Sequence, residues 1–163
     1  MRDTRINVKI WERMTNADLT SEAKLVLLNL YTSFRRNLFG ITVVDQGMIH
    51  HETGLSREQV KDAIDELTEK DFIFQGDRKE YLVKNFVLCN PFVSDSVYNI
   101  YKSSIDETND KSLIHLLLSE YDGKIPAPVA AALIDKNIVP RSEFSISDEK
   151  LDAARNGNRT KKD

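Results

Sequence analysis

The amino-acid sequence predicts a small α+β fold, and three patterns lead to that prediction. Residues 19–34 carry apolar side chains at helical spacing, whereas residues 41–44 form a short β-branched run. Residues 72–86 hold two apolar runs on either side of a polar turn, which is typical of a hairpin. Between these segments, residues 45–70 have the pattern of two helices joined by a turn at Gly54.

Length and composition are those of an ordinary globular chain. The protein has 163 residues, of which 40% are hydrophobic and 30% charged, which indicates one domain or one domain with an appendage. No apolar run is long enough to span a bilayer and the start has no apolar signal region, so we expect no membrane partner. The single cysteine, Cys89, cannot form an internal disulfide. We therefore expect a cytoplasmic location and interpret Cys89 as a small core residue.

The charge of the chain limits how it could bind nucleic acid. The formal net charge is −3, and residues 1–90 hold 13 basic and 14 acidic side chains. Non-specific affinity for DNA comes mainly from the neutralisation of phosphates by Lys and Arg. Binding to DNA would therefore have to rest on a local basic patch.

The first two elements are predicted from side-chain spacing. Residues 5–11 alternate between polar and apolar side chains, which is typical of a half-buried strand ending near Trp11. One side of that strand would carry Ile6, Val8 and Ile10. Thr20 or Ser21 is the expected N-cap of the helix that follows. The predicted core face of this helix contains Ala23, Leu25, Val26, Leu27, Leu28, Leu30, Tyr31 and Phe34.

Two consecutive helices are predicted next. Asp45 is the expected cap of a helix that runs to about Glu52. Ser56, followed three residues later by Gln59, fits a capping box at the start of a helix over residues 57–70. The apolar stripe of that helix is Val60, Ala63, Ile64 and Leu67. Two helices joined by a short turn containing glycine form a helix-turn-helix.

The hairpin completes this unit. Residues 72–74 and 81–83 are predicted to pair, and the tip between them, residues 75–80, would be the wing of a winged helix-turn-helix. We place this domain in residues 1–90 and expect its last strand to continue through residues 86–89. The fold class is therefore α+β, a winged helix-turn-helix with a C-terminal helical extension.

The extension is predicted over residues 91–140, because helical spacing returns after Pro91. Helices are expected from about Ser94 to Ile105, over 111–121 and over 129–138. The second has five large apolar side chains: Leu113, Ile114, Leu116, Leu117 and Leu118. Such a face is too broad to stay exposed, so the extension should pack on the winged helix or mediate a homodimer.

Residues 141–163 are expected to be a polar, mobile tail. A final short helix is predicted within it, over residues 147–156.

These segments together resemble the phage replication proteins of the replisome-organiser type, whose N-terminal winged helix is similar to that of the primosomal protein DnaD. The resemblance covers residues 5–121 and is carried by residues 8–11, 19–24, 37–41, 51–55, 81–86 and 90–97. It implies binding to origin DNA or to a replisome partner such as a helicase loader, in the host cell cytoplasm if the chain is phage-encoded. Proteins of this type usually continue into a longer C-terminal region. A chain that ends soon after Pro140 is therefore expected to be a shortened relative, or to act through its winged helix alone.

The candidate DNA contacts are basic or amide side chains near the second helix of the motif, which enters the major groove in DNA-binding winged helices. Its first turn offers Arg57, Gln59 and Lys61. Phosphate contacts are expected from Arg78 and Lys79 on the wing and from Arg35 and Arg36 after the first helix.

The remaining outward face of that helix is acidic, since it carries Glu58, Asp62, Asp65 and Glu69. Phosphates would be repelled by these carboxylates, so the alternative is a face that binds a protein. Asp62, Asp65, Glu66 and Glu69 could mimic a catalytic carboxylate cluster, but their helical spacing is more simply a solvated face.

No catalytic residue, cofactor or metal is expected. The chain has no phosphate-binding Gly-rich loop, no HExxH motif and no nucleophile elbow, which argues against an enzyme. His50 and His51 are adjacent and would point about 100° apart on a helix, so we expect one to pack inward and one to face solvent. His115 is expected to pack among leucines.

Three functions follow in order of preference. The first is a phage replication-type module that binds DNA, a replisome partner, or both. The alternative is a phage winged-helix protein that binds and inhibits a host protein, such as a defence or replication factor. The third is a transcriptional regulator.

Overall fold

The computed structural model describes residue 6 and residues 9–90, 97–121 and 125–156, except for the side chains of residues 88 and 89. Its helices are α1 (Lys9–Asn16), α2 (Ser21–Thr32), α3 (Gln46–Thr53), α4 (Arg57–Glu69), α5 (Phe86–Cys89), α6 (Tyr98–Glu107), α7 (Ser112–Glu120), α8 (Ala127–Asp135) and α9 (Asp148–Asn156). Its strands are β1 (Ile41–Val43), β2 (Ile73–Gln75) and β3 (Glu80–Val83). Two short 3-10 turns are η1 (Asp77–Lys79) and η2 (Arg141–Glu143). The predicted α+β class is confirmed.

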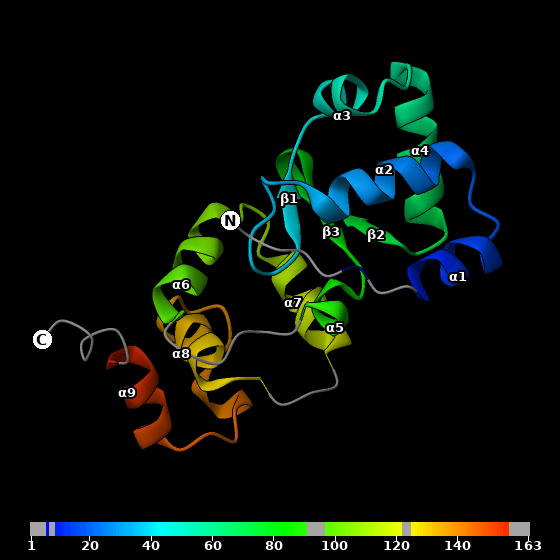
Figure 1. Ribbon diagram of the computed structural model, residues 1–163. Coiled ribbons are helices and arrows are strands. Elements are labelled where there is room, and N and C mark those ends of the chain that lie inside the picture. The colour runs from blue at the N-terminus through cyan, green and yellow to red at the C-terminus, as the bar shows by residue number, and fades with distance from the viewer. Residues whose placement is uncertain (1–5, 7–8, 91–96, 122–124, 157–163) are drawn as a thin grey trace, which may run out of the picture.

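The sheet lies within the N-terminal part of the chain. Figure 1 shows α1 to α4 and the strands at one end of the molecule, and α8 and α9 at the other. The strand order is β1-β3-β2, and β3 pairs antiparallel with both neighbours. Ile41 stands opposite Leu82, and Ile73 opposite Val83, so apolar side chains meet across both ladders. The predicted hairpin is confirmed.

Local capping explains where α2, α3 and α4 begin and where α3 ends. Thr20 and Asp45 cap α2 and α3 through side-chain oxygens that accept backbone N–H bonds of 3.2 and 2.8 Å. Ser56 and Gln59 form the predicted capping box, with reciprocal bonds of 3.1 and 2.9 Å. Gly54 ends α3 at a φ of 74°, a left-handed conformation that glycine adopts without strain.

The core of this unit forms between α2, α4 and the sheet. The predicted apolar stripe of α4 is buried: Val60, Ala63, Ile64 and Leu67. Helix α4 packs against α2. Phe86 lies beneath the turn before β1, where a Cβ on Gly40 would stand 2.7 Å from its ring. Gly40 is therefore required by a close approach as well as by its φ of 81°.

The predicted strand over residues 5–11 is wrong where the structure describes it, because residues 9–16 form α1. Ile10 and Met14 lie four residues apart and are both buried on one face of that helix. Ile6 and Trp11, in contrast, are exposed. Helical spacing between Ile10 and Met14 decides the conformation, and Val8 lies outside the described residues.

The predicted core face of α2 is too wide at two positions. Phe34 is 81% exposed because α2 ends at Thr32 and the chain turns before Phe34 is reached. Leu25 is 41% exposed, since it lies on the solvent side of the helix. The remaining side chains of the predicted face are buried or half-buried.

The last strand does not continue through residues 86–89, because these residues form α5. Asn85 adopts a left-handed φ of 58°, which turns the chain out of β3. Phe86 then packs against Tyr31, with the ring centroids 5.1 Å apart. The side chain of Cys89 lies outside the described residues.

The helical extension packs on the hairpin. Leu113 of α7 reaches Gly76, at the outer end of β2, and Glu120 pairs with Lys84 at 3.0 Å near the end of β3. The buried face of α7 consists of Leu113, Ile114 and Leu117. Packing within the chain is thus observed, whereas the homodimer stays a prediction. The predicted cap near Ser94 lies outside the described residues.

Part of the segment expected to be a mobile tail is folded. The predicted helix near its end is confirmed as α9, which packs on α8 and buries Leu151. Arg155 holds Asp135 of α8 at 2.7 Å, so a charged pair adds to this contact. Residues 157–163 lie outside the described residues. Within the described ranges, no helix combines the length and the apolar character that crossing a membrane requires.

Candidate binding surface

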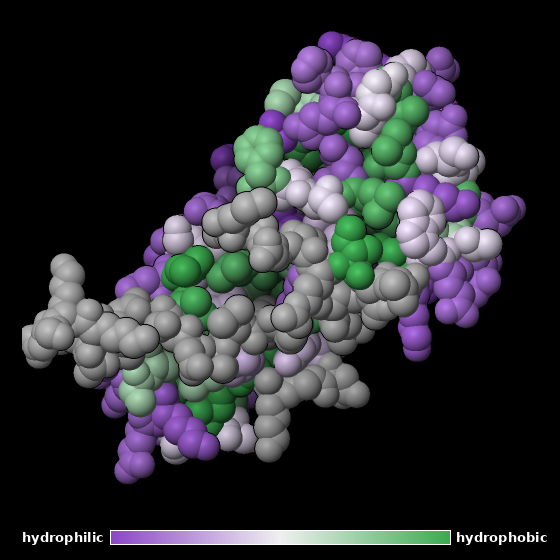
Figure 2. Space-filling view, viewed as in Figure 1, coloured by the Kyte–Doolittle hydropathy of each residue, from purple (hydrophilic) through white to green (hydrophobic). Residues whose placement is uncertain are grey.

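The exposed side of α4 is an acidic stripe. The four carboxylates predicted for this face are all exposed and follow one another at spacings of three or four residues: Glu58, Asp62, Asp65 and Glu69. Only Asp65 forms an ion pair among the described residues, with Lys61 of the same helix at 3.6 Å. Figure 2 shows hydrophilic side chains gathered at the end of the molecule where α3 and α4 lie. We call this set of four residues the acidic face of α4.

Glu66 does not belong to that face, although its spacing suggested a carboxylate cluster. Its carboxylate accepts hydrogen bonds from the backbone N–H and the hydroxyl of Thr20, at 3.1 and 2.5 Å, and pairs with Lys70 at 2.9 Å. Burial alone would raise the pKa of Glu66, but these hydrogen bonds outweigh it and the pKa is lowered. Glu66 therefore fastens α4 to the start of α2.

The first turn of α4 offers less to a nucleic acid than its sequence suggests. Gln59 has both ends of its amide engaged, since Oε1 accepts from Ser56 and Nε2 donates to Glu22 at 3.3 Å. Lys61 is exposed but stands beside Asp65. Arg57 is exposed and makes no ion pair among the described residues. Gln59 and Lys61 each have a carboxylate partner, whereas Arg57 has no ion-pair partner among the described residues.

The predicted phosphate contacts after α2 are wrong for Arg36. This side chain is buried, and its guanidinium lies 4.1 Å from the centroid of the Phe86 ring. Arg35 is half-buried and donates to Glu52 of α3 at 2.6 Å. Hydrogen bonds from Asn29 and Arg35 hold the pKa of Glu52 below its ordinary value. These two arginines hold the fold together near the start of β1.

The tip of the β2–β3 hairpin keeps its two basic side chains exposed. Arg78 and Lys79 both have positive φ values, of 52° and 67°, in a tight turn closed by the bond from the Glu80 N–H to the Asp77 carbonyl. Lys79 pairs with Asp45 at 3.4 Å, and the pKa of Asp45 is lowered, first by its bond from Met48 and then by Lys79. Arg78 makes no ion pair among the described residues.

Basic side chains on α4 and at the hairpin tip stand close to carboxylates. Two of its cations, Lys61 and Lys79, already face carboxylates, although exposed pairs of this kind contribute only about 0–1 kcal/mol each. If a nucleic acid docked along α4, its phosphates would lie beside all four carboxylates of the acidic face. These carboxylates would repel phosphates.

The three histidines differ in their surroundings. His50 is half-buried, with Nδ1 2.5 Å from the carbonyl of Leu55, and His51 is exposed, which is the predicted division between them. His115 was expected to pack among leucines but is exposed, because it lies on the outer side of α7. Among the described residues, no three metal-ligating side chains gather at one point.

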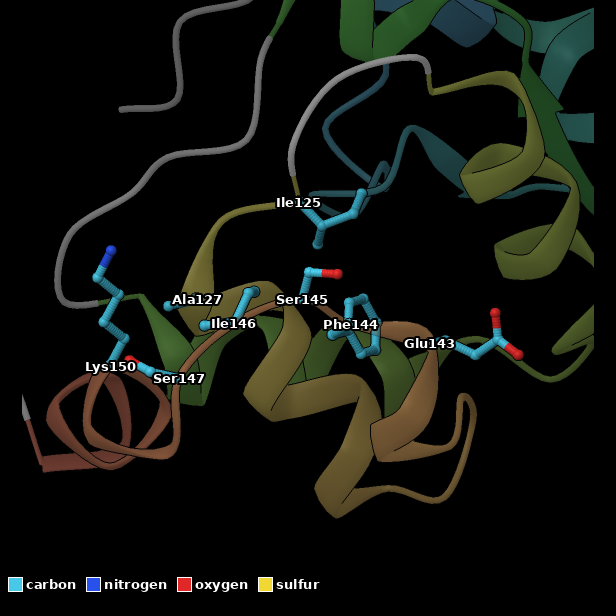
Figure 3. A pocket seen from close by; sticks show the side chains of 8 residues that line it. All are labelled: Ile125, Ala127, Glu143, Phe144, Ser145, Ile146, Ser147 and Lys150. Atoms are coloured by element: carbon cyan, nitrogen blue, oxygen red, sulfur yellow. The ribbon is translucent and has the colours of Figure 1, made fainter.

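A pocket of about 710 Å³ opens between the start of α8 and residues 143–150 (Figure 3). Phe144 and Ile125 form part of its apolar lining, and Glu143 and Lys150 stand toward opposite ends. None of the side chains that the sequence singled out for binding lines this pocket. No sequence pattern predicted it, because it joins segments that are irregular in sequence.

Comparison with known proteins adds no relative: neither the protein-family models, nor the curated proteins, nor the solved structures contain a match to this chain.

Proposed function

We propose that residues 20–90 form a winged helix-turn-helix that binds a partner protein through the acidic face of α4. The fold part of this proposal is supported by the element order α2-β1-α3-α4-β2-β3, with the sheet order β1-β3-β2. It is also supported by the glycine turn between α3 and α4. Winged helices serve both nucleic-acid and protein recognition, so the surface has to decide the use.

The observation that carries the proposal is the acidic face of α4, because α4 is the helix that would enter the major groove in a DNA-binding winged helix. Three of its four members, Glu58, Asp62 and Glu69, have no ion-pair partner among the described residues. A partner with Lys and Arg side chains at matching spacing would supply those counter-charges and be steered toward this face.

The resemblance to replisome-organiser proteins implies origin DNA or a replisome partner such as a helicase loader. Of these two, the acidic face of α4 favours the replisome partner. A host defence or replication factor with a basic surface would use the same face. The proposed role is binding rather than catalysis.

The test replaces Asp62 and Asp65 with asparagine, which removes two charges and preserves side-chain shape. The matched control, Glu143→Gln with Glu149→Gln, changes the net charge equally on exposed side chains far along the chain from α4. Tagged proteins would be used to capture partners from a lysate, and the captured protein would then be titrated at rising salt. We expect the α4 variant to lose the partner and the control to retain it. Equal binding by both variants would refute the acidic face as the site.

A second candidate, binding to DNA, is favoured by one observation: two consecutive basic residues occupy strained backbone conformations at an exposed hairpin tip. In this case Arg57, Lys61, Arg78 and Lys79 carry binding. Replacing all four with alanine should abolish a gel shift and flatten its salt dependence. The Asp62→Asn, Asp65→Asn variant should then bind DNA more tightly, the reverse of its effect on a protein partner. A transcriptional regulator would use this same surface.

A further inference from the structure

The seam between the sheet and the α6–α7 region is rich in buried polar groups. Of the described polar side chains that are buried, four lie there: Asn37, Glu80, Ser104 and Thr108. Asn37 Nδ2 donates to the hydroxyl of Thr108 at 2.9 Å and to the carbonyl of Ser104 at 3.3 Å. Interfaces between parts of a chain that move relative to one another tend to be polar in this way, whereas permanent cores are apolar.

Glu80 is the most unusual member of this seam. Its carboxylate is fully buried at the start of β3, beside the wing tip. One oxygen accepts from the backbone and side-chain amides of Asn109, at 2.6 and 3.2 Å, and the other accepts from the Asp110 N–H at 2.7 Å. No cation pairs with Glu80 among the described residues. A buried carboxylate held only by neutral donors regains strong hydration when the contact opens.

Two further contacts bring the wing tip against the same loop. The Asp77 N–H donates to Asp110 Oδ2 at 3.2 Å. Gly76 lies so close to α7 that a Cβ would stand 2.6 Å from Leu113 Cδ1. The contact therefore joins residues 76–80 of the hairpin to residues 109–113.

Each side of the contact is also held by bonds of its own. Lys111 donates through Nζ to the carbonyls of Ile105 and Thr108, which fixes the loop onto the end of α6. Asp110 Oδ1 accepts from the Ser112 N–H at 2.9 Å, at the start of α7. On the hairpin side, the Gly76 N–H donates to the Glu80 carbonyl at 2.9 Å. Separation would therefore leave both loop and hairpin with their local structure.

We propose that residues 76–80 and 109–113 form a releasable latch, which opens while α2 and α4 remain folded. When closed, the latch fixes the position of Arg78 and Lys79 relative to α7. Opening releases the wing tip from the C-terminal helices, so the position of the tip depends on whether the latch is closed. A partner that binds one latch state more tightly than the other would change the proportion of open latch. Opening or closing the latch would in turn change the affinity for that partner.

The test is amide hydrogen exchange on the full-length protein at low denaturant concentrations, with Glu80→Gln as the probe. The wild-type amides of Asp77, Asn109 and Asp110 should exchange through an opening with a smaller denaturant dependence than that of Ile64 in α4. The substituted side chain would present an NH₂ group to backbone donors and lose the charge. Amide exchange at the latch should therefore accelerate on the order of 10- to 100-fold. The amides of α4 should still exchange only through global unfolding.

Ile64→Val is the matched control, because it weakens the core of α4 without touching the latch. It should accelerate exchange through global unfolding and leave the sub-global opening unchanged. If Glu80→Gln does not fold, Asp110→Asn serves as the second probe. Its amide oxygen can still accept from the Ser112 N–H, whereas the NH₂ group that replaces Oδ2 cannot accept from the Asp77 N–H. The proposal would be overturned if the latch amides exchanged only through global unfolding, both in the wild type and in the variant that folds. The measurement needs no ligand, so loss of the proposed partner function would leave this result intact.

Discussion

At the residue scale, the tip of the β2–β3 hairpin holds two consecutive residues in a strained backbone conformation. Arg78 and Lys79 follow one another in the left-handed region, where two-residue hairpin loops normally place Asn-Gly. A side chain with a Cβ in this conformation costs about 1 kcal/mol or somewhat more. The sequence thus keeps two cations where a more stable pair is available, which suggests that their charge is used.

Replacing Arg78 with Asn and Lys79 with Gly should therefore stabilise the protein, by about 1 kcal/mol, because both positive φ values become easier to adopt. Urea denaturation would measure the change. The control pair, Arg78→Ala with Lys79→Ala, removes the same charges but retains both Cβ atoms, and should give little or no gain. Equal stabilisation by the two pairs would show that charge, and not backbone strain, is responsible.

Glu66 leads to a prediction about pH. Its pKa is lower in the folded protein than its ordinary 4.5, so the stability it contributes is present above 4.5 and is lost as the pH falls through the lower folded value. Glu66→Gln should lower stability near neutral pH by about 1–2 kcal/mol. The variant should also lose less stability than the wild type on acidification from about pH 5 to pH 3. Denaturation curves at several pH values test both parts. Parallel losses in the two proteins would contradict the assigned role.

At the element scale, α4 holds the N-terminal unit together through one side and presents its carboxylates on the other. Ile64 is fully buried, and α4 contacts both α2 and β2. The two sides of this helix should therefore respond to substitution in opposite ways.

Ile64→Asp would bury a carboxylate without a partner and should destabilise the fold by at least about 3–5 kcal/mol. Asp65→Asn, the next residue along the helix, is exposed and should change stability by less than about 0.5 kcal/mol. Thermal unfolding followed by circular dichroism would compare them. An Ile64→Asp variant that melts like the wild type would show that α4 is not packed as described.

At the scale of the whole molecule, α7 lies between the N-terminal unit and the C-terminal helices. Its buried face is used within the chain, by contact with the hairpin, whereas Leu116 remains 36% exposed. The apolar surface that suggested a homodimer is thus largely consumed by internal packing.

Leu113→Ala should therefore destabilise the protein by about 2–5 kcal/mol, since it leaves a cavity against the hairpin. Leu116→Ala should have a much smaller effect and leave the molecular mass in solution unchanged. Light scattering and urea denaturation of the two variants provide the comparison. A dimeric wild type that Leu116→Ala converts to a monomer would instead place a homodimer interface on the outer side of α7.

What the sequence determined by itself is the set of local elements. Caps at Thr20, Asp45 and Ser56, the turn at Gly54 and the stripe of α4 were all predictable, because each depends on residues no more than a few positions apart. The acidic face of α4 was predictable for the same reason. The strand predicted over residues 5–11 failed because Ile10 is shared by two competing periodicities, and burial of Met14 selects the helix.

Only the tertiary structure decided which polar side chains are free to bind a partner. Arg36 looked like a phosphate contact in the sequence but lies buried against Phe86. Glu80 looked like part of an exposed wing but is buried against amides 29 and 30 residues further along the chain. Periodicity records the face of an element on which a residue lies, but not what covers that face. Burial of a charge depends on partners brought together by the chain path, and those partners leave no local pattern in the sequence.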